Sequence, residues 1–202
     1  MFALVESGSI TKMMNGNKGI TIGDNQYPAS FFTSVYSEAE RNAVGVYTIE
    51  IDETNKKDEE WYINTNITYS FSGGKVKGTY GTATGKAIAD TLYTNTDKSN
   101  GDIPADKDVG DVKEEGLKTV LIRQVKEEAK FLLSDTDWYI TRNAEKSTAI
   151  PSAITTYRDS VRTKQAEMET AITDAADTPA LETLYTRNNS GVRPLGDFPV
   201  KE

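Results

Sequence analysis

Residues 61–82 read WYINTNITYSFSGGKVKGTYGT, and this stretch decides that the N-terminal half is built from strands. From Trp61 to Phe71, apolar and aromatic side chains alternate with largely polar ones, a period of two that predicts a half-buried strand. Ser72-Gly73-Gly74 then turns the chain, and residues 75–82 return as a second strand. The stretch therefore predicts an antiparallel hairpin with one buried and one wet face.

Further strand signals lie before this hairpin. Phe2 to Val5 and Ser9 to Met13 flank Ser7-Gly8, a dipeptide that favours a tight hairpin turn. A third β-type segment, Gly19 to Ile22, is followed by a turn, and Val46 to Ile51 again alternates between two faces. We therefore expect a β-rich domain over residues 1–93.

One short helix should interrupt these strands, between Ser37 and Ala43. Ser37 is a good N-cap and Glu40, three residues later, completes a capping box, while Gly45 is placed to end the helix. An aromatic and apolar group just before this helix should anchor the core of the domain. Its members are Phe31, Phe32, Val35 and Tyr36.

The second half is helical in pattern. Residues 94–110 are rich in Asn, Thr, Asp, Lys, Ser and Gly and predict a polar linker. Leucine, valine and alanine recur by threes and fours from Leu117 to Leu133, and Pro151 suits the first turn of a second helix that ends near Ala175. We expect a helical hairpin domain over residues 111–185, with a short third helix after Pro179, and an irregular C-terminal arm over residues 186–202.

The seven-residue repeat of Ile154, Val161, Met168 and Ala175 has two interpretations. It is compatible with a coiled coil, but three short heptads with Lys164 in the seam favour the helical hairpin. In that hairpin the ring of Trp138 is expected to lie between the two helices and cover their open end. The fold class expected for the whole chain is α+β.

The 202 residues contain neither histidine nor cysteine and carry a net charge of −8. Without these two residue types, Ser–His–Asp and Cys–His nucleophiles and the His- and Cys-based metal sites are excluded. Lys and Arg form no cluster of the kind that binds phosphate, so we expect no nucleic-acid partner. No signal peptide and no transmembrane helix is expected, and therefore no membrane partner.

Carboxylates and glycines supply the remaining candidate chemistry. Asp135 and Asp137 lie at a helix boundary, where aspartate commonly caps or turns the chain. Asp106, Asp108 and Asp111 could offer oxygens to calcium but lack the order of a calcium-binding loop, which favours a solvated linker. Gly78, Gly81 and Gly85 do not have the spacing of a phosphate-binding loop and are expected to be strand glycines at a bulge or at a close approach. We expect neither a cofactor nor a metal.

One segment of the helical half resembles a known family. The run LLSDTDWY at Leu132–Tyr139, then Pro151, then TYRDSVR at Thr156–Arg162, resembles a C-terminal module that recurs in tail proteins of tailed bacteriophages. The residues that match the pattern are Leu133, Thr136, Asp137, Trp138, Pro151, Tyr157 and Arg158. The opening MFALVESGSITK is similar to the start of many phage virion proteins, so the resemblance covers about a third of the chain.

This resemblance implies a structural component of the virion tail, at the fibre or baseplate end, made in the host cytoplasm. Its partners would be other tail proteins and further copies of itself, and no enzymatic activity is expected. The module also occurs in tail-fibre assembly chaperones, which leave before the virion matures, so a chaperone is the first alternative. A hydrolase of host glycans that uses carboxylates alone is the second. The interface candidates are Trp138, Tyr139, Phe198 and Pro199.

Overall fold

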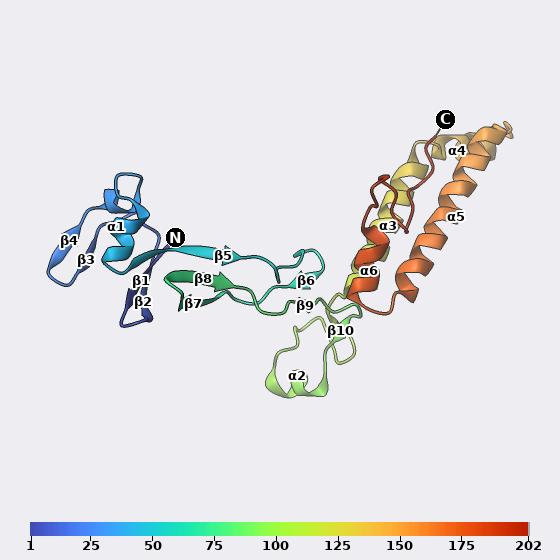
Figure 1. The fold of residues 1–202 in the computed structure, drawn as a ribbon. Coiled ribbons are helices and arrows are strands. Elements are labelled where there is room, and N and C mark those ends of the chain that lie inside the picture. The colour runs from blue at the N-terminus through green and yellow to red at the C-terminus, as the bar shows by residue number, and fades with distance from the viewer. Residues whose placement is uncertain (202) are drawn as a thin grey trace. The chain divides into compact units, whose positions relative to one another are not determined.

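The computed structural model describes residues 1–201 and divides into two compact units, Met1–Thr84 and Gly85–Glu202 (Figure 1). The first unit is rich in strands and the second holds the long helices, which confirms the α+β class. The division comes earlier than expected, because residues 85–93 belong with the helical unit.

A five-stranded sheet forms the first unit, in the order β2-β1-β5-β8-β7. Its strands are β1 (Phe2–Glu6), β2 (Ser9–Met14), β5 (Val46–Asp52), β7 (Thr68–Ser72) and β8 (Lys75–Thr79). Both predicted hairpins, β1–β2 and β7–β8, are antiparallel and joined by two-residue turns. All four turn residues have positive φ, from 51° at Ser7 to 78° at Gly8, as a type I′ turn requires.

The pairing of β5 with β8 is parallel, a feature that the predicted antiparallel hairpins do not include. It makes the sheet mixed, because the chain passes β7 before it returns beside β5. The edge strands β2 and β7 contact each other, so the sheet curls.

The curl separates two apolar clusters on opposite faces of the sheet. Alternate residues of β1 contribute to each, so that Ala3, Leu4 and Val5 are all buried. Leu4 packs with Phe31 and Phe32 beneath the 3₁₀ turn η1 (Ala29–Phe32), and Tyr36 packs against this cluster, which confirms these three members of the predicted anchor. The expectation is wrong for the fourth member, Val35, which is 71% exposed. Also on the first unit are the hairpin of β3 (Ile20–Ile22) and β4 (Asn25–Tyr27), and helix α1 (Glu38–Ala43). Ser37 and Glu40 form the predicted capping box of α1.

The expected strand from Trp61 to Phe71 is wrong as a continuous element. Only β6 (Tyr62–Ile63) and β7 form, with an irregular segment between them. There the side chain of Asn64 makes two hydrogen bonds to the backbone of Lys57. Its Oδ1 accepts from the Lys57 N–H at 2.9 Å, and its Nδ2 donates to the Lys57 carbonyl at 2.8 Å. Thr65 Oγ1 accepts from the N–H of Gly81 at 2.6 Å. These side chains take the place of ladder hydrogen bonds, so the alternation does not extend.

The segment 94–110, predicted as a linker, instead lies between two paired strands of the second unit. β10 (Thr91–Leu92) pairs with β11 (Val112–Glu114), and the loop that joins them contains helix α2 (Asn95–Asn100). Thr94 and Asp97 form a capping box for α2, a local signal that the polar composition conceals. The two-residue strand β9 (Thr84–Gly85) lies at the boundary between the units.

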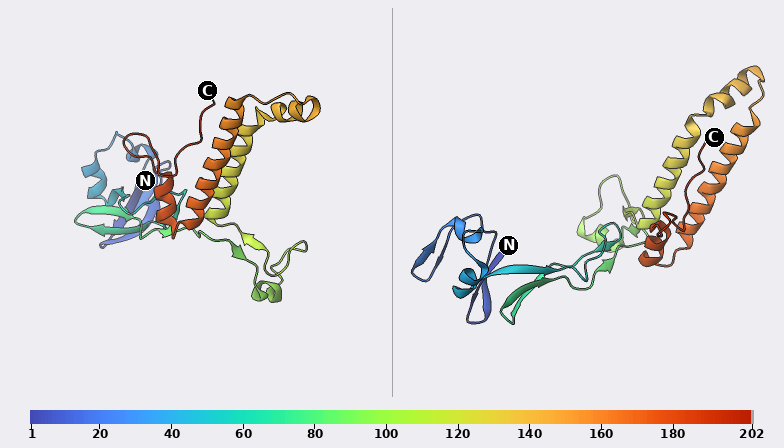
Figure 2. Two further views of the ribbon diagram at one scale, coloured as in Figure 1. Left: turned by 90° about the vertical axis from the view of Figure 1, so that its right-hand side faces the viewer. Right: turned by 45° about the horizontal axis from the view of Figure 1, so that its top comes forward.

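Helices α3 (Leu117–Ser134) and α5 (Ser152–Asp174) pack side by side and confirm the helical hairpin (Figure 2). Their buried apolar residues are Leu121, Val125 and Ala129 on α3, and Val161, Met168 and Ile172 on α5. The predicted third helix is α6 (Thr178–Tyr185), which contacts α5. A further helix, α4 (Asp137–Lys146), occupies the connection between α3 and α5.

Candidate protein interface

The elbow between α3 and α4 is held by an arginine from α5. Arg158 is only 7% exposed, and its Nη1 donates to the carbonyl of Leu133 at 2.9 Å and to Thr136 Oγ1 at 2.6 Å. The same nitrogen lies 2.9 Å from Oδ1 of Asp137, the first residue of α4. One side chain therefore joins the end of α3, the elbow and the start of α4.

Thr136 is the centre of this arrangement and is fully buried. Its hydroxyl donates to the Leu133 carbonyl at 2.8 Å while it accepts from Arg158, and its backbone N–H also donates to Leu133 at 3.0 Å. The last carbonyls of a helix have no partner within the helix, and these donors satisfy one of them at the end of α3, that of Leu133. We call Leu133, Thr136, Asp137 and Arg158 the elbow cluster.

Trp138 follows this cluster and is half exposed, at 50%. The expectation that its ring lies between the two helices is therefore wrong, because α4 carries the ring to the surface. The ring lies against Tyr139, with centroids 3.8 Å apart, and the guanidinium of Arg142 lies 4.7 Å from the Trp138 centroid. Arg142 is a functional candidate that the sequence reading missed, although its spacing of four from Trp138 is a usable signal on a helix.

The C-terminal arm carries the other two candidates, Phe198 and Pro199, both half-buried. Before them the chain is well held: Leu195 is 3% exposed, and Asp197 pairs with Arg187 at 2.8 Å and Arg193 at 3.0 Å. The nearby arginines hold the pKa of Asp197 below its ordinary value. Beyond Asp197, no hydrogen bond or ion pair joins residues 198–201 to the other described residues.

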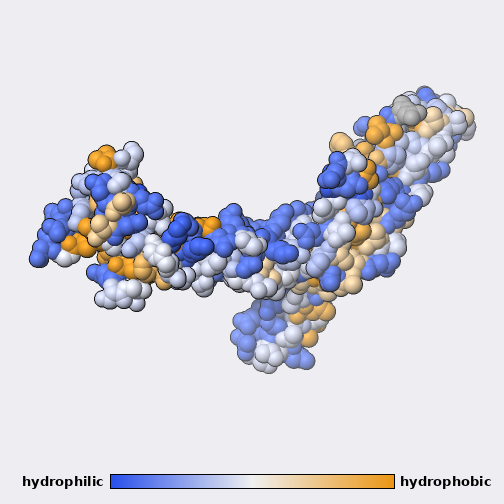
Figure 3. All heavy atoms as spheres, in the orientation of Figure 1, coloured by the Kyte–Doolittle hydropathy of each residue, from blue (hydrophilic) through white to orange (hydrophobic). Residues whose placement is uncertain are grey.

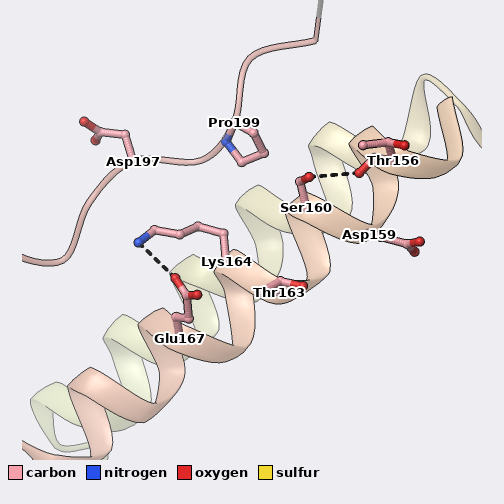
Figure 4. A pocket seen from close by; sticks show the side chains of 8 residues that line it. All are labelled: Thr156, Asp159, Ser160, Thr163, Lys164, Glu167, Asp197 and Pro199. Atoms are coloured by element: carbon pink, nitrogen blue, oxygen red, sulfur yellow. Dashed lines mark hydrogen bonds and ion pairs between the residues drawn. The ribbon is translucent and has the colours of Figure 1, made fainter. Parts of the chain in front are cut away.

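Pro199 lies across α5 and lines a hollow of about 560 Å³ with the helix (Figure 4). The lining on α5 is made of short polar side chains, among them Thr156 and Ser160, and of the pair Lys164 and Glu167. The hollow is open, and Asp159 and Asp197 complete its polar lining. It lies on a different side of α5 from the elbow, because Arg158 points to Thr136 whereas Thr156 and Ser160 face the arm.

Three of the carboxylates singled out in the sequence, Asp108, Asp111 and Asp137, have partners in the structure. Asp137 is engaged by Arg158. Asp108 accepts from the N–H of Val109 and from Lys98, which lowers its pKa, and Asp111 accepts from the N–H of Asp108. Across residues 1–201 no group of three His, Cys, Asp or Glu residues is placed to hold a metal ion.

The three glycines allow close approach. A Cβ on Gly78 would lie 2.8 Å from the side chains of Ile51 and Ile67, and one on Gly85 would lie 2.7 Å from Thr178 Oγ1. Gly81 is similarly close to Thr65, at 3.1 Å. Close packing rather than phosphate binding accounts for all three positions.

Among the helices of the described chain, none combines the length and the apolar character needed to cross a membrane. Comparisons with protein-family models, with curated proteins and with solved structures find no match to this chain.

Proposed function

We propose that this chain is a structural component of a bacteriophage virion tail, in the fibre or baseplate region, that works through protein–protein interfaces. The observation that carries the proposal is the elbow cluster. Arg158, which the phage-like module places some twenty residues after Thr136 and Asp137, contacts both of them. The module therefore forms one local structure. Helix α4 starts from it and carries Trp138 at the surface.

The side chains on α4 are suited to binding. Tryptophan, tyrosine and arginine are the types most enriched at the energetic centres of protein interfaces, and Trp138, Tyr139 and Arg142 here form one stacked group. Ile140, on the same helix, is 41% exposed. Because Arg142 already rests on both rings, the group is ordered before a partner arrives, which lowers the entropy cost of binding.

Quantitative mass spectrometry of purified virions tests the proposal. A structural part is present in a fixed number of copies per particle, in proportion to the other tail proteins. The alternative, an assembly chaperone, would be abundant in infected lysate and missing from particles. That result would overturn the proposal.

The role of the α4 group is tested by a matched pair of phage variants. Trp138→Ala should lower incorporation of the protein into particles at least tenfold, since a central interface tryptophan contributes about 2 kcal/mol or more. Phe131→Ala is the control, because Phe131 on the neighbouring α3 is 73% exposed and lies outside the stacked group. Equal incorporation of the two variants would show that the α4 group is not the interface.

A further inference from the structure

The chain contains two Asn-Gly steps, Asn15-Gly16 in the first unit and Asn100-Gly101 in the second. Asparagine followed by glycine is the dipeptide most prone to deamidation, because glycine has no side chain to shield its backbone nitrogen from the asparagine side chain. The two steps share this chemistry. A difference in their reactivity must therefore come mainly from the folded structure.

The surroundings of the two steps are closely matched. Asn15 and Asn100 are both exposed, and neither side chain makes a hydrogen bond to another residue of the described chain, 1–201. Gly16 and Gly101 both have a left-handed backbone, with φ of 74° and 76°. Exposed side chains and a largely hydrophilic surface (Figure 3) give water access to both steps.

The backbone N–H groups of the two glycines are held differently. Gly101 is the C-cap of α2, and its N–H donates to the carbonyls of Asp97 and Lys98, the latter at 3.2 Å. Gly16 lies in the loop between β2 and β3, and its N–H donates to no other residue that the structure describes. A nitrogen that donates at a helix end attacks only after local opening, whereas the Gly16 nitrogen needs no such step.

Helix α2 is held by more than its C-cap. Thr94 and Asp97 form the capping box at its start, and Asp97 also forms an ion pair with Lys113 of β11. These contacts stabilise the short helix against opening. They therefore oppose the event that would release the N–H of Gly101.

We propose that Asn15 is a site of spontaneous deamidation in the folded protein, and that the structure protects Asn100 from the same reaction. The Gly16 nitrogen loses its proton and attacks Cγ of Asn15. The Cγ–Nδ2 bond breaks, and ammonia leaves with a proton equivalent to the one that the nitrogen lost. Water then opens the cyclic imide to aspartate or isoaspartate, and either product adds one negative charge. The reaction needs only water, and the proposal does not rest on the proposed function.

Isoaspartate at position 15 should disturb the first unit, because it adds one carbon atom to the backbone beside Gly16. A Cβ on Gly16 would lie 2.8 Å from the ring of Phe2 and 2.9 Å from Cβ of Phe32, so this space is already filled. The two rings lie 5.0 Å apart, and Phe32 is buried in the apolar cluster around Phe31. A longer backbone presses Gly16 against these rings, which should lower the stability of the unit.

Peptide mapping by mass spectrometry tests the proposal on the purified full chain, incubated at a mildly alkaline pH that favours loss of the amide proton. Asn15 should deamidate at least about tenfold faster than Asn100, because release of the Gly101 N–H requires local opening. In concentrated urea neither N–H is held, and the two rates should agree within about threefold. Labelling by an isoaspartyl methyltransferase separates isoaspartate from aspartate. An unmodified Asn15, or equal rates at the two sites in the folded chain, would overturn the proposal.

Two variants test the structural causes separately. Thr94→Ala removes the capping box and should raise the rate at Asn100 about fivefold while the rate at Asn15 stays the same. Asn15→Gln should keep its thermal midpoint during the incubation, because glutamine would have to close a larger ring, whereas wild type loses stability as isoaspartate accumulates. An unchanged rate at Asn100 in the first variant, or an equal loss of stability in the second, would contradict the structural account. None of these results depends on whether virions contain the protein.

Discussion

Replacing Arg158 by methionine should destabilise the helical unit by about 2–4 kcal/mol. Methionine fills much of the volume but leaves the Leu133 carbonyl and the buried Thr136 hydroxyl without the charged donor. Each hydrogen bond from a charged group contributes about 1.5–3 kcal/mol. Removing the guanidinium also removes the cost of taking its charge out of water, which offsets part of this loss. The ion pair with Asp137 adds little, because the Asp137 side chain is 62% exposed and its charge is screened by water.

The measurement is thermal and urea unfolding followed by circular dichroism at 222 nm, which reports the helices of the second unit. A loss of about 3 kcal/mol lowers the midpoint of a unit of this size by roughly 10 °C. Arg162→Met is the matched control, since Arg162 lies one turn further along α5, is 51% exposed and pairs with the exposed carboxylate of Asp159. It should change stability by less than about 0.5 kcal/mol.

Two further variants separate the contributions within the elbow cluster. Thr136→Val removes one hydroxyl from a fully buried position and should cost about 1–2 kcal/mol. Asp137→Asn should cost less than about 1 kcal/mol. If Arg158→Met unfolds within about 0.5 kcal/mol of wild type, the elbow is held by apolar packing and the reasoning from hydrogen bonds is refuted.

Three other predictions concern different parts of the chain. Gly85→Ala should destabilise the second unit by about 1–3 kcal/mol in thermal unfolding, because the new methyl would meet the Thr178 side chain; an unchanged midpoint would contradict that contact. The ion pair with Lys113 lowers the pKa of Asp97, so the stability it contributes is present above pH about 4 and is lost as the pH falls further. The midpoint difference between wild type and Lys113→Met should therefore be greatest near neutral pH and shrink progressively as the pH falls below about 4, without vanishing at about pH 2, because the folded chain holds the pKa of Asp97 far below its ordinary value. A difference that stays constant from about pH 6 to about pH 2 would refute the role of this pair. Phe31→Ala should cost about 3–5 kcal/mol in the first unit, measured by near-ultraviolet circular dichroism, because Phe31 is 1% exposed; a loss below about 1 kcal/mol would show that the aromatic anchor is dispensable.

The parts of the fold that sequence predicted well depend on neighbouring residues. A capping box needs two side chains three residues apart, as at Ser37 and Glu40, and a type I′ turn needs residues that tolerate positive φ, as at Gly73-Gly74. The long helices follow for the same reason, because a stripe of apolar residues with helical spacing is visible within each segment. One local signal was missed: the capping box at Thr94 lies within a segment whose polar composition predicts a linker.

The candidate site was predictable only in part. The module that contains Trp138 was recognised as a pattern, but its chemistry did not follow from the pattern. That Arg158 is buried, and that it meets Thr136, depends on how α5 packs against α3. Exposure of Trp138 likewise depends on the direction of α4, which the elbow cluster sets. A single sequence does not state which of two faces of a helix its neighbour covers.

By itself, then, the sequence determined the class of each half, the local turns and caps, and the absence of histidine and cysteine chemistry. Those properties depend on residue type and on spacing within a few residues. The tertiary structure decided the parallel pairing of β5 with β8, the break at Asn64 and the close packing of side chains around Gly78. Each of these depends on contacts between segments that meet only after folding. Their free energy comes from burial and hydrogen bonding between distant residues, which local patterns do not record.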